Sequence, residues 1–272
     1  MNRPFSLATS ELRRSLPTVT GDDAQAADSE RLQREAAFHD DTFSSNTRQA
    51  AGKYYATARA ARAHYHELIL DGVGSHTVLE YGCGRGSAAF DLAGGGAHVT
   101  GIDISEVGIR EAQAHAETLG LVDQLSFRQM NAEALQFDDA SFDLVCGSGI
   151  LHHLDLGQAV IEIVRILRPG GRAVFFEPLG HNPFINLYRR MTPAMRSADE
   201  HPLSMADLER ITSSFGAANV SFFGLFTLLA APLHPGPDSG LLRWLEAVDR
   251  LVLGRSWLQR HAWIVVTQLT RP

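Results

Sequence analysis

Short apolar runs recur along the middle of the chain, separated by longer stretches in which apolar residues return every three or four positions. The runs have the length of buried strands and lie at 77–81, 98–103, 125–130, 142–146 and 172–176. The intervening stretches have helical periodicity and lie at 87–93, 105–119 and 156–167. Two later runs, at 220–229 and 262–269, flank a helical pattern near 241–253. This alternation predicts βαβ units and an α/β fold: a mostly parallel sheet of seven strands with helices on both faces.

The regions on either side of this alternation differ from it in composition. Residues 1–30 are rich in Ser, Thr, Asp and Ala without sustained periodicity, so we expect a mobile N-terminal arm. Residues 31–72 have helix-like intervals and are predicted to form a helical lid segment before the first strand. Residues 73–272 then form the main domain, in which the prolines and arginines of about 179–203 indicate a cap insertion after the fifth strand.

The composition favours one large core and excludes several classes of partner. The 272 residues are 44% hydrophobic and carry a formal charge of -7, without the basic clusters that bind phosphates, so no nucleic-acid partner is expected. The only cysteines, Cys83 and Cys146, lie at predicted strand ends, which excludes a disulfide framework. No stretch approaches the ~18 uninterrupted apolar residues of a membrane helix. We therefore expect a soluble, cytoplasmic protein with no membrane partner.

A glycine-rich turn follows the first predicted strand. Gly82, Gly84 and Gly86 have the spacing G-x-G-x-G, and Ser87 stands where a dinucleotide-binding turn would have its third glycine. Glu80, two residues before the turn, would repel a pyrophosphate but suits the ammonium group of an amino-acid moiety. The charge pattern therefore favours S-adenosylmethionine over NAD.

A second acid supports an adenosine ligand. Asp103 ends the second predicted strand, about twenty residues after the turn, where a carboxylate can accept hydrogen bonds from both ribose hydroxyls. Alone it could be a helix cap or a solvated loop acid. Together with the glycine turn it indicates ribose binding.

Several ordered motifs give the chain a family resemblance. From residue 31 onward, and most securely over 78–177, it resembles the class I S-adenosylmethionine-dependent methyltransferases, in the small-molecule branch that includes quinone-pathway enzymes. In place of the Asp-Ala pair common at the adenine edge, this chain has Asn131-Ala132. The resemblance implies a Rossmann-like catalytic domain and a set of cofactor-binding residues. These are Glu80, Gly82, Cys83, Gly84, Gly86, Asp103, Ile104, Asn131, Ala132, Gly147, Ser148 and His153.

Candidate residues for catalysis lie after the fourth and fifth strands. His152, Glu177 and His201 are candidates for a general base or for positioning the acceptor. His153 is expected on the cofactor side, because the family resemblance puts a histidine there in enzymes with unrelated acceptors. Four aromatic residues are expected in the lid or the acceptor pocket: Tyr54, Tyr55, Phe184 and Tyr188. No H-E-x-x-H or paired C-x-x-C spacing occurs, so no metal site is predicted.

The sequence thus predicts methyl transfer from S-adenosylmethionine to a small molecule. The aromatic-rich C-terminal region suggests an apolar or aromatic specialised metabolite, with oxygen, nitrogen and carbon nucleophiles all open. The alternative is a non-catalytic member of the fold that binds the cofactor as a regulatory or structural module. The pattern is compatible with a monomer or a homodimer.

Overall fold

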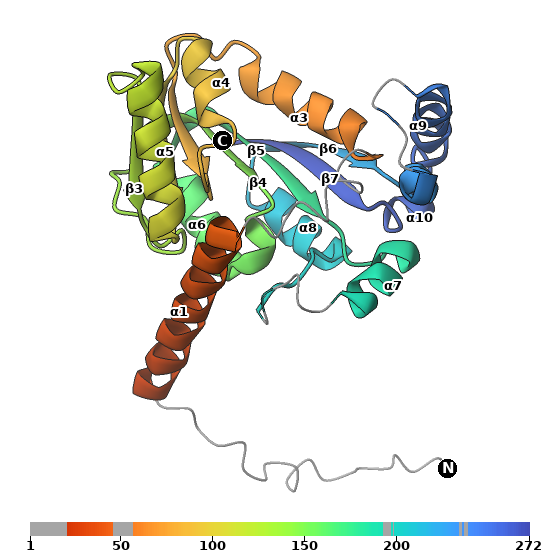
Figure 1. Ribbon diagram of the computed structural model, residues 1–272, viewed down its shortest axis with the longest axis horizontal. Coiled ribbons are helices and arrows are strands. Elements are labelled where there is room, and N and C mark those ends of the chain that lie inside the picture. Colours follow the sequence, from red (N-terminus) through yellow and green to blue (C-terminus); the bar gives the residue numbers. More distant parts are fainter. Residues whose placement is uncertain (1–20, 46–56, 193–196, 198, 234–235, 237–238) are drawn as a thin grey trace, which may run out of the picture.

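The computed structural model describes residues 21–45, 57–192, 197, 199–233, 236 and 239–272. Seven strands form one sheet in the order β3-β2-β1-β4-β5-β7-β6 (Figure 1). The neighbours from β3 to β5 are parallel, and β7 is antiparallel to both β5 and β6. The strands are Thr77–Tyr81 (β1), His98–Asp103 (β2), Leu125–Gln129 (β3), Phe142–Ser148 (β4), Leu167–Pro178 (β5), Ala217–Phe223 (β6) and Ile264–Thr270 (β7). The predicted Rossmann-like sheet is confirmed.

Each face of the sheet has its own apolar core. Val78 and Leu144 belong to one cluster, whereas Leu79 and Val145, the next residues along their strands, belong to the other. Because both faces are buried, the central strands read as continuous apolar runs in the sequence. The helices of the first face are Arg59–Leu70 (α3), Ala89–Gly94 (α4) and Glu106–Leu119 (α5), and those of the second are Leu156–Ile166 (α6) and Met205–Ser213 (α8) (Figure 1).

The strand order reverses beside β1. The chain proceeds outward from β1 to β2 and β3, then returns to place β4 on the other side of β1. A parallel sheet leaves a crevice at the carboxyl ends of its strands where the order reverses, because successive loops diverge there. The fold therefore places the binding site above β1 and β4.

The predicted N-terminal segment divides into two helices with different roles. Helix α1 (Gly21–Ser45) begins within the part predicted to be a mobile arm, where Ala-Gln-Ala-Ala at 24–27 favours helix. Helix α3 packs on β5 and β7 with Ala61, Tyr65 and Ile69 buried, so it belongs to the core and is not a lid. Residues 1–20 and 46–56, including Tyr54 and Tyr55, lie outside the described residues.

The predicted insertion lies between β5 and α8. An isolated bridge between Leu179 and Leu203 joins the two ends of the insertion, which contains α7 (Pro183–Met191). Helix α8 then starts with a capping box made by Ser204 and Asp207. The strand expected at 220–229 is shorter than predicted, because Gly224 adopts a φ of 79° and a 3-10 helix, η4 (Thr227–Leu233), follows it.

The structure also bears on the cysteines and on the length of the apolar helices. Both cysteines, Cys83 and Cys146, are buried and form no disulfide. Within the described ranges, no helix combines the length and apolar character needed to cross a membrane.

Candidate active site

A cavity of about 650 Å³ lies at the carboxyl ends of β1, β2 and β4. The loops after these strands form one wall, with Gly82, Asp103 and Asn131. Helices α1 and α7 and the segment around His152 contribute to the rest of the lining. The volume falls in the range of small-molecule sites, roughly 300–1,000 Å³.

The glycine turn has a conformation that other residues would not adopt. Gly82 and Gly84 have φ values of 72° and 52°, in the left-handed region. A Cβ on Gly82 would lie 2.7 Å from Ile150 Cγ1, and one on Gly84 would lie 2.9 Å from Phe43 Cζ. The two glycines therefore allow close approach of the chain segments that enclose the cavity.

Glu80 supports the glycine turn from behind. Its Oε1 accepts hydrogen bonds from Ser87 Oγ (2.6 Å) and Ala88 N (2.7 Å), and its Oε2 accepts one from Ala89 N (2.9 Å). Burial raises the pKa of Glu80 to about 7, although these hydrogen bonds act in the opposite direction. Glu80 is not among the residues that line the cavity. The expectation that it faces the ammonium group of a ligand is therefore corrected: its carboxylate is used by the start of α4.

Asp103 joins the glycine turn to the loop after β2. Its Oδ2 accepts a hydrogen bond from Gly84 N (2.7 Å), and its Oδ1 accepts one from Ser105 N (2.9 Å). Asp40 of α1 reaches the same loop, where it accepts a hydrogen bond from Ser105 Oγ (2.5 Å). Asp103 lines the cavity, and the ribose-binding role expected for it stays a prediction.

Asn131 and Ala132 line the cavity from the loop after β3. Asn131 Oδ1 accepts a hydrogen bond from Glu133 N (2.9 Å), and the hydroxyl of Tyr81 donates to the carbonyl of Ala132. Both contacts fix the loop beside the cavity.

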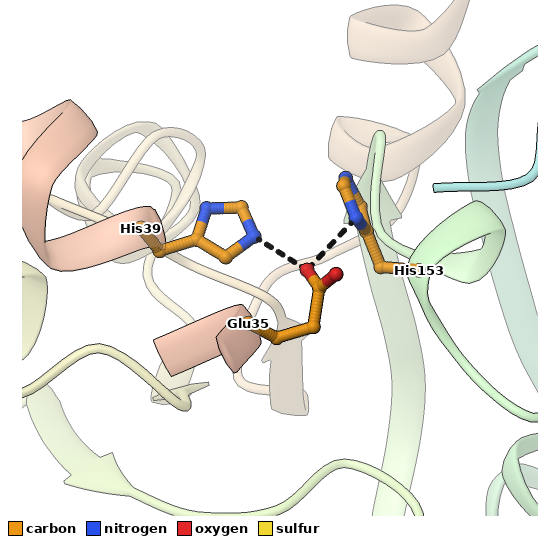
Figure 2. Close-up of side chains that lie close together, drawn as sticks. All are labelled: Glu35, His39 and His153. Carbon is orange, nitrogen blue, oxygen red and sulfur yellow. Dashed lines mark ion pairs between the residues drawn. The ribbon is translucent and has the colours of Figure 1, made fainter. Parts of the chain in front are cut away.

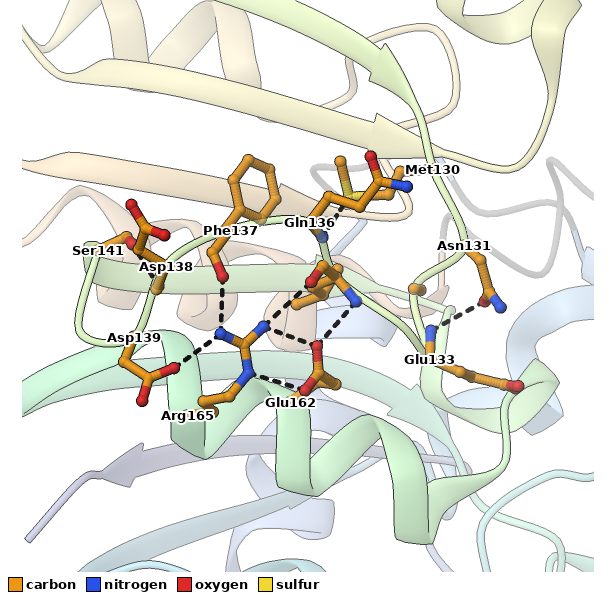
Figure 3. A network of polar contacts seen from close by, with 12 residues as sticks. Met130, Asn131, Glu133, Gln136, Phe137, Asp138, Asp139, Ser141, Glu162 and Arg165 are labelled. Carbon is orange, nitrogen blue, oxygen red and sulfur yellow. Dashed lines mark hydrogen bonds and ion pairs between the residues drawn. The ribbon is translucent and has the colours of Figure 1, made fainter.

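Two residues of α6 hold the same loop through hydrogen bonds. Arg165 donates to the carbonyl of Phe137 (2.7 Å), as Figure 3 shows, and to the carbonyl of Leu135 (3.1 Å). Glu162 pairs with Arg165 (2.8 Å) and accepts a hydrogen bond from Leu135 N (2.8 Å). Hydrogen bonds from Arg165 lower the pKa of the Glu162 carboxyl. The network makes α6 a support for the cavity wall.

Helix α1 forms part of the cavity lining. Arg31 pairs with the buried Glu133 (2.5 Å) and donates to the carbonyl of His153 (3.3 Å). Four residues of α1 that line the cavity are spaced four apart and so share one face: Arg31, Glu35, His39 and Phe43.

A second contact between α1 and the main domain involves a carboxylate and two imidazoles. Glu35 Oε2 lies 3.1 Å from His153 Nδ1 and 3.5 Å from His39 Nε2 (Figure 2). Burial alone would raise the pKa of the Glu35 carboxyl, but the two imidazoles hold it well below its usual range. Burial lowers the pKa of His153. His153 therefore serves to attach α1 while it lines the cavity.

His152 forms a pair with Glu177 at the end of β5. His152 lies in the short helix η2 (Leu151–His153), and its Nδ1 is 2.7 Å from Glu177 Oε2. Glu177 Oε1 accepts hydrogen bonds from the backbone N–H groups of Ile150 and Leu151, both at 2.9 Å. His152 lines the cavity, whereas Glu177 is buried behind it.

The order of these motifs matches known proteins. Residues 79–175 match the family model described as a methyltransferase domain. An uncharacterized protein of Haemophilus influenzae is 32% identical over 176 residues, which are 63% of this chain and 70% of that protein. A ubiquinone biosynthesis O-methyltransferase of Nitrosomonas europaea is 34% identical over 128 residues, which are 47% of this chain and 54% of that enzyme. The chain belongs to the class I S-adenosylmethionine-dependent methyltransferases.

Solved structures of other methyltransferases share the fold. The geranyl diphosphate C-methyltransferase from Streptomyces coelicolor A3(2) is 16% identical, with a TM-score of 0.57 over 77% of this chain and 76% of that one. That enzyme was crystallised with Mg²⁺, geranyl-S-thiolodiphosphate and S-adenosyl-L-homocysteine. The chain spans about half the length of the ubiquinone biosynthesis O-methyltransferases that it matches, 54% and 49% in two cases.

The cavity fits S-adenosylmethionine in volume and in the placement of polar groups. Asp103 and Asn131 lie beside the glycine turn, where the adenosine end would be held. Ten of the residues predicted to bind the cofactor line the cavity: Gly82, Cys83, Gly84, Gly86, Asp103, Ile104, Asn131, Ala132, Ser148 and His153. Gly147, like Glu80, is not in the lining.

The residues predicted on the acceptor side are brought together only in part. His152 and Tyr188 line the cavity, and Glu177 supports His152. His201 is exposed and outside the lining, because its backbone N–H bonds to the carbonyl of His152 (2.8 Å) and its ring turns to the carbonyl of Asp199. Phe184 is 51% exposed on the outer face of α7. The assignments of His201 and Phe184 to the site are therefore corrected.

The sequence interpretation expected a helical lid over 31–72 but did not identify the residues of α1 that line the cavity. Arg31, Glu35, His39 and Phe43 recur at intervals of four, which on a helix places a charged and aromatic stripe on one face. A stripe of this kind predicts that the helix face contacts another part of the chain. Its partners, His153 and Glu133, lie more than a hundred residues away in sequence and only the tertiary structure identifies them.

Proposed function

We propose that the chain transfers the methyl group of S-adenosylmethionine to a hydroxyl group of a small, apolar acceptor. The observation that carries this proposal is that one cavity is lined by the glycine turn, Asp103 and His152, and that Glu177 contacts His152 from behind the cavity wall. The first set suits an adenosine with an amino-acid chain, and the second suits removal of a proton from a nucleophile.

The chemistry divides between the cofactor and the protein. Bound S-adenosylmethionine supplies a methyl group activated by a sulfonium cation. As the acceptor oxygen forms its bond to the methyl carbon and the carbon–sulfur bond breaks, the hydroxyl proton passes to His152. The walls of the cavity align the acceptor and exclude water, and alignment of this kind contributes roughly 7–11 kcal/mol in favourable cases.

Glu177 gives His152 the tautomer that the reaction requires. The carboxylate of Glu177 accepts hydrogen bonds from Ile150 N and Leu151 N, and it offers its other oxygen to His152 Nδ1. A carboxylate accepts and does not donate, so Nδ1 carries the proton and Nε2 has the lone pair. Glu177 is thus a positioning residue, and Nε2 of His152 is the proposed base.

The acceptor is proposed to be apolar because of the wall beside His152. Its residues come from β5, α7 and the start of β7: Phe176, Ile185, Tyr188, Trp263 and Ile264. Oxygen is the proposed nucleophile because a hydroxyl group needs the base that the pair provides. The names of relatives point the same way, among them a 27-O-demethylrifamycin SV methyltransferase of Amycolatopsis mediterranei that is 38% identical over 97 residues.

Helix α1 is proposed to be the lid of this site. It is joined to the main domain by the pairs Arg31–Glu133 and Glu35–His153, and the two partner groups lie in loops beside the cavity. Detachment of α1 would open the cavity to cofactor and acceptor. Hydrogen exchange tests this role: protection in 21–45 should rise when S-adenosylhomocysteine binds, and equal exchange in both states would contradict it.

The proposal is tested in two steps with the full chain. Calorimetry should show binding of S-adenosylhomocysteine but not of NAD, and reversal of this preference would refute the cofactor assignment. Label from methyl-labelled S-adenosylmethionine should then pass to hydroxylated aromatic or polyketide acceptors in a panel, and their O-methyl ethers should not be substrates. Binding without transfer to any member of the panel would favour a non-catalytic role.

A further inference from the structure

The C-terminal helices carry an exposed apolar surface at the β6 edge of the sheet. Helices α9 (Gly240–Val252) and α10 (Ser256–Gln259) lie at the edge of the molecule beyond β6 (Figure 1). The exposed fractions are 43% for Leu241, 62% for Trp244, 79% for Leu251 and 70% for Trp257. These four residues are here called the α9–α10 surface.

The exposed side chains of α9 are distinct from those that hold the helix to the protein. Leu241, Trp244 and Leu251 share one face, because they are separated by three and seven positions. Another face packs inward and is buried: Leu242, Leu245 and Asp249. The helix therefore has an apolar side for the core and a second apolar side that the fold does not cover. Large exposed apolar patches of this kind mark interaction sites.

The exposed charged side chains of residues 239–260, all of which the structure describes, are arginines. The two acids of α9 are occupied within the protein: Glu246 pairs with Arg59 (2.7 Å), and the buried Asp249 accepts hydrogen bonds from the backbone N–H groups of residues 225–227, including Thr227 N (3.2 Å). Four arginines beside the surface are exposed, and no carboxylate in the described part of the chain forms an ion pair with them: Arg243, Arg250, Arg255 and Arg260. The surface is thus basic on a chain whose formal charge is -7.

We propose that the α9–α10 surface docks on an anionic lipid surface, with α9 lying along the plane of the interface. Tryptophan and leucine side chains enter the boundary between headgroups and acyl chains, and tryptophan favours that boundary because it has an apolar body and a polar N–H group. The arginines pair with anionic headgroups. The sequence predicted no membrane partner because it has no apolar stretch long enough to cross a membrane, but a helix that lies along the interface needs no such stretch.

A second copy of the chain fits this surface less well. In a twofold symmetric dimer the same patch is present on both subunits, so the arginines of one copy would face those of the other. Like charges set against each other oppose association. A lipid surface with negative headgroups removes that repulsion.

The location of the surface also suits access by an apolar molecule to the cavity. The chain passes from α10 directly to Trp263 and Ile264, which line the cavity. Docking by α9 and α10 would bring this wall near the lipid. The docking proposal does not depend on methyl transfer, and it is tested by binding alone.

The experiment is flotation of the full chain with vesicles of phosphatidylcholine, with and without phosphatidylglycerol. We expect flotation with the anionic vesicles only, weakened by salt. The W244S/W257S variant should reduce partitioning by about tenfold or more. The R243Q/R250Q variant should reduce it by about fivefold for each arginine. Tryptophan emission should shift to the blue when the wild-type chain binds.

Matched variants elsewhere on the surface serve as controls. The L119S/V122S variant replaces two exposed apolar residues, and R110Q/R210Q removes two exposed arginines. Both should float like the wild type, and all variants should keep the wild-type melting temperature within a few degrees. No flotation at low salt, or equal flotation of W244S/W257S and wild type, would overturn the proposal. A dimer that W244S/W257S dissociates, without flotation, would assign the surface to a second copy.

Discussion

Replacement of Glu177 by glutamine should change the tautomer of His152 while the imidazole ring keeps its position. Glutamine has nearly the same shape, and its carbonyl oxygen can still accept from Ile150 N and Leu151 N, as Glu177 Oε1 does at 2.9 Å. Its amide nitrogen would then face His152 Nδ1, now 2.7 Å from Oε2. Two donors cannot face each other, so Nδ1 must become the acceptor and the ring proton must move to Nε2. The proposed base would lose its lone pair.

The substitution should affect stability, kcat and cofactor affinity to different extents. The variant replaces a hydrogen bond between an imidazole and a carboxylate by one between an amide and an imidazole, which lowers the free energy of unfolding by about 1 kcal/mol. Loss of general base catalysis lowers kcat by about 10²–10⁴-fold. The affinity for S-adenosylhomocysteine should change little, because Glu177 does not line the cavity.

The assay compares Glu177→Gln with Asp41→Asn, a matched carboxylate-to-amide change at a residue of α1 that lines the cavity. Methyl transfer to the best acceptor of the panel gives kcat and KM, and calorimetry gives the affinity for S-adenosylhomocysteine. A kcat for Glu177→Gln within threefold of wild type, in a folded protein, would refute the role of the pair. An equal loss in both variants would show that the effect is one of cavity charge.

Three further predictions concern the walls of the site. The raised pKa of Glu80, about 7 against an ordinary 4.5, means that the folded protein binds the extra proton and loses stability as pH rises between these values. The destabilisation caused by Glu80→Gln should therefore shrink by up to about 3 kcal/mol between pH 5 and pH 8 in denaturant titrations, and a constant difference would contradict the burial argument. Arg165→Met should weaken binding of S-adenosylhomocysteine and lower the free energy of unfolding by about 1–3 kcal/mol, because two carbonyls of the loop after β3 lose their donor. An unchanged affinity in calorimetry would show that the loop keeps its conformation without Arg165. Arg31→Met leaves Glu133 buried without its partner, so amide exchange in α1 should accelerate while the sheet keeps its protection, and unchanged exchange would remove the pair from the attachment of α1.

The local pattern of the sequence determined the sheet, the glycine turn and Asp103. Strands buried on both faces must be apolar throughout, and a turn that adopts positive φ values favours glycine, as at Gly82 and Gly84. These requirements act on neighbouring residues, so they are visible without the rest of the chain. The same reasoning located His152 and Glu177, each at the carboxyl end of a strand or just after it.

The tertiary structure decided how distant elements use these side chains. Glu80 was expected to face the ligand, yet the start of α4 takes up both of its oxygens. The stripe on α1 was visible as a spacing, but its partners His153 and Glu133 were not, because periodicity shows which residues share a face and not what covers that face. The α9–α10 surface has the same origin. Its apolar residues look like core residues in the sequence, and only the packing of the helix shows that they remain exposed.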